Sequence, residues 1–212
     1  MKPVQLKKRP SSKTARLVAA LAMSSLGLIT TAHAQSAAFT LSSPDLASGS
    51  FDNKFILNGF GCTGGNVSPA LEWRNVPAGT KSLSLQIHDP DAPTGSGFWH
   101  WGVYNMPPTT TGLAQGAGNS PATLPAPAYG GNTDFQDTGA TGVNGNYGGP
   151  CPPAGDKPHR YVFTLYALAV DDVQKAGGIP KTGTSALYSF VLNKGIGANL
   201  LGKASFTATY GR

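Results

Sequence analysis

The chain has 212 residues, and its 16 lysines and arginines outnumber its 10 aspartates and glutamates, for a formal net charge of +6. Six of the basic residues lie before Gln35 and no acidic residue does, so 10 basic and 10 acidic residues remain after that point. A nucleic-acid-binding protein needs a clustered basic face, and this neutral remainder excludes that class of partner.

The first 34 residues have the pattern of a secretory signal peptide. Basic residues precede the apolar run 17–29, and the segment ends in the small-residue motif Ala32-His33-Ala34. The run is shorter than the ~20 residues of a membrane-spanning helix, and no second run follows. We therefore expect cleavage of 1–34 on the general secretion route, no membrane span afterwards, and a periplasmic or secreted location. Residues 35–212 match the size of a single domain.

Alternating apolar and polar residues predict β-strands along most of the remaining chain. Segment 81–88 places Leu83, Leu85 and Ile87 on one face and polar side chains on the other, which predicts a strand whose polar face is exposed to solvent. Segment 161–168 is apolar on both faces and predicts an interior strand. Further strands are expected at 39–42, 100–105 and 205–210.

Only one segment, 184–193, has a clear helical pattern. Its apolar stripe is expected to contain Leu187, Phe190, Val191 and Ile196, with a polar residue capping its start and Gly195 ending it. A second short helix is expected at about 171–176. Several strands with one or two short peripheral helices, and no alternation of strand and helix, predict a mainly β fold with two antiparallel sheets packed as a sandwich.

The two cysteines, Cys62 and Cys151, predict a disulfide, since an even number of cysteines in an exported protein is typical of one. This disulfide would close a loop of 89 positions, from Cys62 to Cys151. The chain-entropy model gives about 4–5 kcal/mol of stabilisation for a loop of that length. The alternative is a reactive thiol at Cys151 assisted by His159, which an oxidising compartment disfavours.

Three clusters of polar and aromatic residues lie beside predicted strands. They are Asp89-Pro90-Asp91-Ala92-Pro93, Trp99-His100-Trp101 and His159-Arg160-Tyr161. Strand ends hold the backbone rigid and leave side chains accessible, so these clusters can converge on one pocket. Taken singly, Asp89 and Asp91 also fit a turn, and His100 and His159 fit hydrogen-bonded structural histidines.

A carboxylate and two imidazoles together could bind an anion or ligate a metal. Neither HExxH nor CxxC spacing is present, so no metal and no cofactor is expected.

The segment 148–153 predicts a stiff loop whose backbone N–H groups could contact an anion. His88, on the polar face of its strand, is expected at the surface. The motifs of common hydrolases, nucleotide hydrolases and oxidoreductases are missing, so no enzymatic activity is expected.

In this order, the clusters resemble the phosphatidylethanolamine-binding protein family, in its bacterial Raf kinase inhibitor-like branch. The first cluster resembles the family's first signature, the second its continuation, and Gly149-Pro150-Cys151-Pro152-Pro153 with the third cluster its second signature. The resemblance implies two antiparallel sheets and a small pocket for phosphate, acetate or phosphorylated headgroups. The implied ligand-binding residues are Asp89, Asp91, Pro93, Trp99, His100, Gly149, Pro152, Pro153, His159 and Tyr161.

The favoured hypothesis is an exported protein that binds a small anion or phosphoryl headgroup and inhibits or modulates a protein partner, such as a protease or receptor. One alternative is a protease inhibitor or interaction protein that acts through its loops, including 139–149, with a vestigial pocket. The other is a phosphoester hydrolase with Asp89, His100 and His159 as acid–base groups.

Overall fold

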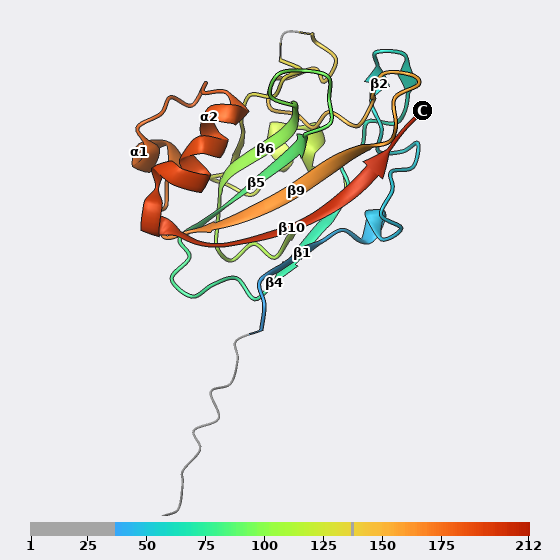
Figure 1. The fold of residues 1–212 in the computed structure, drawn as a ribbon. Helices are drawn as coiled ribbons and strands as arrows, with labels where there is room; N and C mark the ends of the chain where they lie inside the picture. The colour runs from blue at the N-terminus through green and yellow to red at the C-terminus, as the bar shows by residue number, and fades with distance from the viewer. Residues whose placement is uncertain (1–36, 137) are drawn as a thin grey trace, which may run out of the picture. The chain divides into compact units, whose positions relative to one another are not determined.

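The computed structural model describes residues 37–136 and 138–212, and the predicted signal peptide lies outside them (Figure 1). The described residues form two larger antiparallel sheets, one two-stranded antiparallel sheet and few short helices, which confirms the predicted mainly β fold. The five-stranded sheet has the order β10 (Leu200–Tyr210), β9 (His159–Leu168), β5 (Ser82–Asp89), β6 (Phe98–Met106) and β8 (Tyr129–Gly130). The three-stranded sheet has the order β1 (Thr40–Ser42), β4 (Leu71–Arg74) and β7 (Gly112–Leu113).

Smaller elements connect and cover the sheets. The hairpin strands are β2 (Asn58–Gly59) and β3 (Cys62–Thr63), and the helices are α1 (Val173–Gly177) and α2 (Ser185–Phe190), which a π-turn continues over Val191–Gly195. Single 3-10 turns lie at η1 (Pro44–Leu46), η2 (Ala117–Asn119), η3 (Pro121–Thr123) and η5 (Gly197–Asn199). Among the described residues, no helix is both long enough and apolar enough to cross a bilayer.

The main core contains the apolar face of the five-stranded sheet and residues of the smaller sheet. Leu83, Leu85 and Ile87 of β5 belong to it, as predicted from their alternation, together with Trp73 of β4. Apolar side chains from both sheets are removed from contact with water in this core. Burial of each side chain contributes about 1.5–3 kcal/mol to stability.

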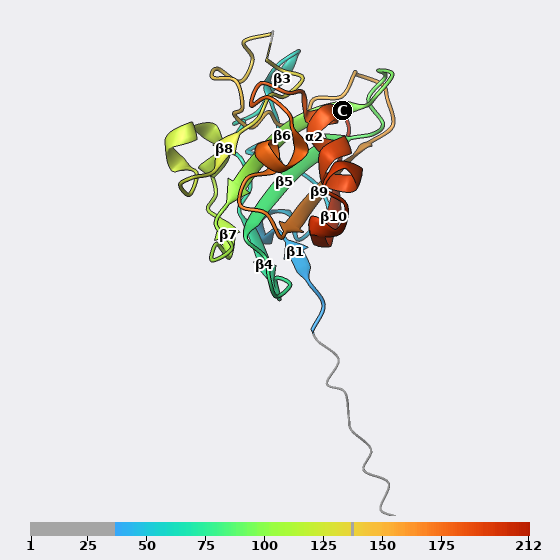
Figure 2. The same cartoon turned by 90° about the vertical axis from the view of Figure 1, so that its left-hand side faces the viewer.

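The prediction that the polar face of β5 is exposed to solvent is wrong. Gln86 is 2% exposed, because α2 lies over this face of the sheet (Figure 2). The Gln86 amide donates to the Ser185 carbonyl and to the Tyr104 hydroxyl, each at 3.0 Å. Tyr188 of α2 stacks on Tyr104 of β6, with ring centroids 3.9 Å apart, and a second apolar core forms around them.

Both predicted helices form, but the predicted apolar stripe is only partly right, because Val191 and Ile196 are buried as predicted and Leu187 and Phe190 are not. Thr184 caps the helix by accepting a hydrogen bond from the Leu187 N–H at 3.2 Å. Leu187 and Phe190 are 37% and 62% exposed, whereas Tyr188 and Val191 are buried. The stacking of Tyr188 on Tyr104 determines which side of this short helix faces the sheet, and the π-turn that follows has a wider period than the assumed 3.6 residues.

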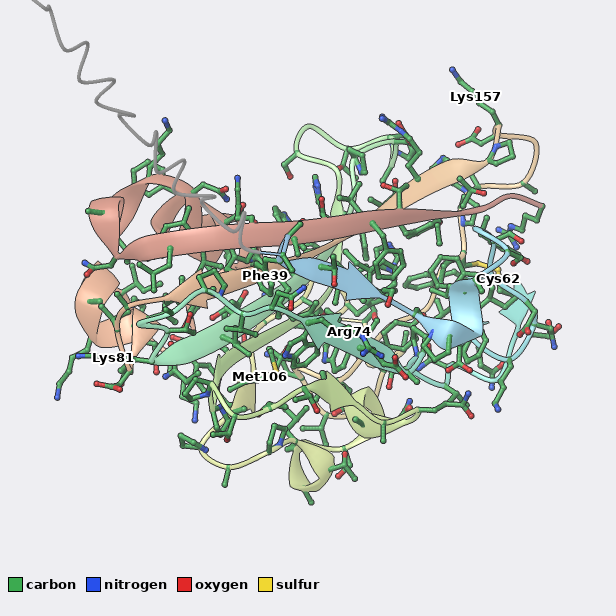
Figure 3. All side chains as sticks on the ribbon, turned by 90° about the horizontal axis from the view of Figure 1, so that it is seen from below. Phe39, Cys62, Arg74, Lys81, Met106 and Lys157 are labelled. Carbon is green, nitrogen blue, oxygen red and sulfur yellow. A yellow bond between two sulfur atoms is a disulfide. The ribbon has the colours of Figure 1, made fainter. Side chains whose placement is uncertain are left out.

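The predicted disulfide between Cys62 and Cys151 is present (Figure 3). It joins β3 to the loop before β9, across a sequence separation of 89 residues. Arg212 reinforces the same junction, because its guanidinium donates to the carbonyl of Pro152 at 2.7 Å and to that of Phe60 at 3.2 Å. Two independent links therefore hold the Pro152 loop against the β2–β3 hairpin.

Replacing both cysteines, as Cys62→Ser with Cys151→Ser, is expected to lower the free energy of unfolding by about 4 kcal/mol, because the unfolded chain regains the freedom of a long loop. Urea denaturation monitored by tryptophan fluorescence measures the loss, with Ser48→Ala, at an exposed turn, as the control. A loss below about 1 kcal/mol would mean that the Arg212 contacts already constrain this loop.

Candidate functional site

A cavity of about 120 Å³ lies where β5 ends and β6 and β9 begin. Seven of the residues predicted to bind a ligand line it: Asp89, Pro93, His100, Pro152, Pro153, His159 and Tyr161. The three clusters that the sequence places beside separate strands therefore do meet at one edge of the sheet. We call this space the Asp89 cavity.

The Asp89 carboxylate is buried and fully hydrogen-bonded. Its Oδ1 accepts from the N–H groups of Asp91 and Ala92, at 2.8 and 3.1 Å, in a turn that begins as β5 ends. Its Oδ2 accepts from Nδ1 of His159 at 2.8 Å, and both side chains are 4% exposed. Three donors therefore compensate the negative charge that burial would otherwise disfavour. The pair also joins the end of β5 to the start of β9.

A β-bulge directs His100 toward the cavity. In the pairing of β5 with β6, Ile87 lies opposite Trp101 and His88 lies opposite Trp99, so His100 has no partner on β5. An extra residue of this kind bends a strand and changes the direction of its side chain. The imidazole contacts the rings of Tyr161 and Phe135, with centroids 5.0 and 5.3 Å away.

His100 is neutral at pH 7 in this environment. Burial lowers its pKa to about 4, because the charged form loses its hydration. Its Nδ1 donates to the Gly148 carbonyl at 2.8 Å, so in the neutral ring Nε2 is an acceptor. The hydrogen bond to Gly148 fixes the orientation of the ring, and protonation of Nε2 would turn it into a donor.

The Tyr161 hydroxyl has no hydrogen-bond partner within the described residues. The side chain is 1% exposed and lines the Asp89 cavity. Burial raises the pKa of this phenol well above its ordinary value, so the group remains an O–H donor. A buried hydroxyl without a partner costs about 1–3 kcal/mol, which indicates that a ligand or water accepts this bond.

Asp91, predicted as a ligand-binding residue, lies outside the cavity. Its carboxylate accepts from Arg160, with Oδ1 2.7 Å from Nη2 and Oδ2 2.9 Å from Nε and from the backbone N–H. These hydrogen bonds, from the side chain first and the backbone second, hold the pKa of Asp91 well below its ordinary range. Asp91 therefore fixes the start of β9 from outside.

Trp99 and Gly149 also lie outside the cavity. Trp99 stacks on His88, its cross-strand partner on β5, with ring centroids 4.0 Å apart. His88, expected at the surface, is half-buried beneath it. The Gly149 N–H donates to Asn66 Oδ1 at 2.8 Å, and the Gly148 N–H donates to the His100 carbonyl at 3.1 Å. Those two backbone donors are therefore occupied, and the expected contact of this loop with an anion cannot come from them.

The cavity has an aromatic wall that the sequence reasoning missed. Its members are Phe60, Phe98 and Phe135, and Phe135 contacts both other rings, at 5.9 and 4.8 Å between centroids. Phe98 could have been found, because a residue two positions before His100 often shares its face of a strand. Phe60 gives no sequence signal, since it lies in a left-handed turn with φ 53°. Ala92, Thr94 and Cys151 complete the lining.

Among the described residues, no three His, Cys, Asp or Glu side chains gather in a way that could hold a metal ion. The residues that line the Asp89 cavity offer the Tyr161 hydroxyl as a donor, Nε2 of His100 as an acceptor, one compensated carboxylate and aromatic rings.

Comparison with known proteins identifies relatives over most of the chain. The family model described as phosphatidylethanolamine-binding protein matches residues 47–211. The YbcL protein of Escherichia coli is 42% identical over 179 residues, which cover 84% of this chain and 90% of that protein. A putative lipoprotein, LppC, of Mycobacterium tuberculosis is 42% identical over 131 residues, or 62% of this chain and 56% of that protein.

Solved structures agree with the sequence matches. The crystal structure of Escherichia coli YbcL, described as a member of the mammalian PEBP family, superposes with a TM-score of 0.71 at 40% identity, covering 83% of this chain and 99% of that one. A putative homologue from Chlamydia trachomatis, CT736, has a TM-score of 0.57 at 27% identity, covering 82% and 98%. The chain therefore belongs to the phosphatidylethanolamine-binding protein family.

Proposed function

We propose that this protein is exported and binds a small anion, a phosphoryl or carboxylate group of a larger headgroup, in the Asp89 cavity. The observation that carries the proposal is the Tyr161 hydroxyl, which belongs to a buried residue of the cavity wall and has no acceptor among the residues that the structure describes. An anionic oxygen bound there accepts this hydrogen bond, and bonds of that kind contribute about 1.5–3 kcal/mol.

His100 supplies the second contact in this proposal. Its Nε2 accepts while the ring is neutral, but a bound anion raises the pKa of the ring by favouring its charged form. The resulting imidazolium donates from Nε2 to the anion in a charge-assisted hydrogen bond. Binding is then accompanied by uptake of one proton.

The hydrogen bonds of Asp89 favour binding over hydrolysis. A general base or nucleophile needs a carboxylate oxygen that faces the substrate or an attacking water. Here Oδ1 accepts from two backbone N–H groups and Oδ2 accepts from His159. Asp89 therefore orients His159 and the turn after β5 rather than acting on a phosphoester.

The size and wall of the cavity indicate which part of a ligand enters it. A volume of about 120 Å³ corresponds to roughly four water molecules, which suits a phosphoryl or carboxyl group and leaves acyl chains outside. The family's description names phosphatidylethanolamine, whose headgroup carries such a phosphoryl group. Phe60, 53% exposed at the mouth, can contact the organic part of the ligand.

Three observations support export. The basic and apolar segments before Gln35 have the pattern of a signal peptide. The Cys62–Cys151 disulfide is typical of oxidising compartments, and one relative carries the name of a putative lipoprotein.

The substitution Tyr161→Phe is expected to weaken binding of glycerophosphoethanolamine about tenfold or more, because the ligand loses one hydrogen bond. The same change should leave the free energy of unfolding unchanged or raise it by about 1 kcal/mol, since it removes an unpaired buried hydroxyl. Isothermal titration and urea denaturation measure the two quantities, with Tyr210→Phe as a matched control outside the cavity. Unchanged affinity in Tyr161→Phe would contradict the proposed contact.

Affinity for glycerophosphoethanolamine should rise as the pH falls from about 8 to 5. The pKa of His100 is about 4 in the free protein and higher in the complex, so between those values the complex holds one more proton. The gain is at most about tenfold per pH unit. The charge of this phosphodiester stays constant over the range, so the ligand does not contribute.

The dependence of affinity on pH should disappear in His100→Gln. It should persist in His88→Gln, because the His88 ring stacks on Trp99 outside the cavity. Since His159 also lines the cavity, a dependence that survives in His100→Gln would assign the proton to the Asp89–His159 pair instead.

A further inference from the structure

Helices α1 and α2 and the π-turn after α2 lie together at one end of the five-stranded sheet (Figure 1). Phe190 of α2 is 62% exposed, more than any other large apolar side chain of the described residues, and Leu187 is exposed beside it. A single exposed apolar side chain is common and needs no explanation. Here, however, the two apolar side chains share their surface with several lysines.

Leu187, Phe190 and Lys194 lie on one side of the segment formed by α2 and its π-turn, because they are three and four positions apart. All three side chains are exposed. The other side of the segment is fixed to the domain, since Tyr188 and Leu192 are buried. The segment is therefore amphipathic in an unusual way, because its exposed side also carries apolar side chains.

Two more lysines adjoin this side. The Lys203 ammonium donates to Asn193 Oδ1 at 3.0 Å, which holds this exposed side chain of β10 next to the π-turn. Helix α1 packs against the π-turn as well, because a Cβ added to Gly177 would lie 2.5 Å from Val191 Cγ1, and Lys175 of α1 is exposed. We call these exposed residues the helical patch: Lys175, Leu187, Phe190, Lys194 and Lys203.

The helical patch is basic in a domain that is otherwise acidic. Residues 169–203 contain four lysines and two aspartates, whereas the rest of 35–212 contains six basic and eight acidic residues. Of the two aspartates, Asp171 is exposed, and Asp172 accepts from the N–H groups of Gln174 and Lys175 at the start of α1. None of the ion pairs among the described residues involves a lysine of the patch.

Lysines around exposed apolar side chains match the surface of an anionic bilayer, where negative headgroups lie directly above an apolar layer. An anionic polysaccharide would pair with the lysines but leave Phe190 in water. We propose that the helical patch docks this protein on a membrane surface rich in anionic phospholipid. Phe190 and Leu187 enter the headgroup region, and the three lysines pair with lipid phosphates.

Docking leaves the Asp89 cavity accessible. β9 begins at the cavity with His159, and Tyr166 of the same strand pairs with Lys203 of the patch. These two positions of β9 are seven residues apart, which corresponds to roughly 23 Å along a strand. The patch and the cavity share no residue, so a docked protein can hold a soluble ligand, and the membrane proposal does not rest on the proposed function.

Co-sedimentation with lipid vesicles tests the docking. The processed protein, which starts at Gln35, is used because the apolar run 17–29 would itself bind lipid. Vesicles of equal parts phosphatidylcholine and phosphatidylglycerol are expected to bind it at least about tenfold more tightly than phosphatidylcholine alone. Raising NaCl to about 0.5 M should weaken this binding, because salt screens the lysines. Equal binding to both kinds of vesicle, or binding to neither, would overturn the proposal.

The apolar contact is tested at Phe190. Phe190→Ser should weaken binding to the mixed vesicles about tenfold, because the bilayer loses one buried apolar side chain. Val143→Ser, at a similarly exposed position outside the patch, should leave binding unchanged. In Phe190→Trp, the mixed vesicles should shift the fluorescence of the new indole to shorter wavelength. Unchanged emission, or unchanged binding in Phe190→Ser, would contradict insertion of this side chain.

The basic contact is tested by two pairs of substitutions that remove the same net charge. Lys194→Gln with Lys203→Gln should weaken binding to the mixed vesicles about tenfold or more. Lys54→Gln with Lys157→Gln should have little effect, since Lys157 lies at the end of the sheet opposite Lys81 (Figure 3).

Equal losses in the two pairs would overturn the assignment to the helical patch. Tyr161→Phe should bind the mixed vesicles as the unmodified protein does, because Tyr161 lines only the Asp89 cavity. A loss in this variant would mean that lipid headgroups bind in that cavity instead. Failure of anion binding in the Asp89 cavity would leave the membrane proposal intact.

Discussion

The site depends on one buried carboxylate. Asp89 lies at the end of β5, and its two oxygens accept from the turn that follows and from His159 at the start of β9. A buried charge is tolerated only when donors surround it, so the turn, the strand start and the imidazole must all occupy their observed places together. Asp91 extends this arrangement outward through Arg160, the next residue of β9. The cavity exists because these contacts hold two strand ends beside each other.

The sequence predicts the architecture well where a pattern reports on a single element. Alternation identified β5, the doubly apolar pattern identified β9, and the cap Thr184 begins α2 where the polar residue indicated. It failed where burial depends on an element distant in the chain. Gln86 looks like a surface residue until α2, about a hundred positions later, covers it.

The same distinction applies to the site. Most of the residues that line the cavity could be predicted from the three clusters beside predicted strands, because the ends of strands in one sheet lie close together. Strict alternation also places Phe98 on the same face as His100, but it gives no sign of the bulge that separates Trp99 from Trp101. Phe60 and Phe135 reach the cavity from irregular loops, where no periodicity exists to read.

The disulfide has a meaning beyond stability, because Cys151 is at once a wall of the Asp89 cavity and one end of the covalent link. Before the two thiols meet an oxidant, the loop and the hairpin that carries Phe60 lack this covalent link, and hydrogen bonds such as those from Arg212 and from the Leu57 N–H to the Pro150 carbonyl join them. The wall of the Asp89 cavity therefore reaches its final covalent form only when the two thiols are oxidised.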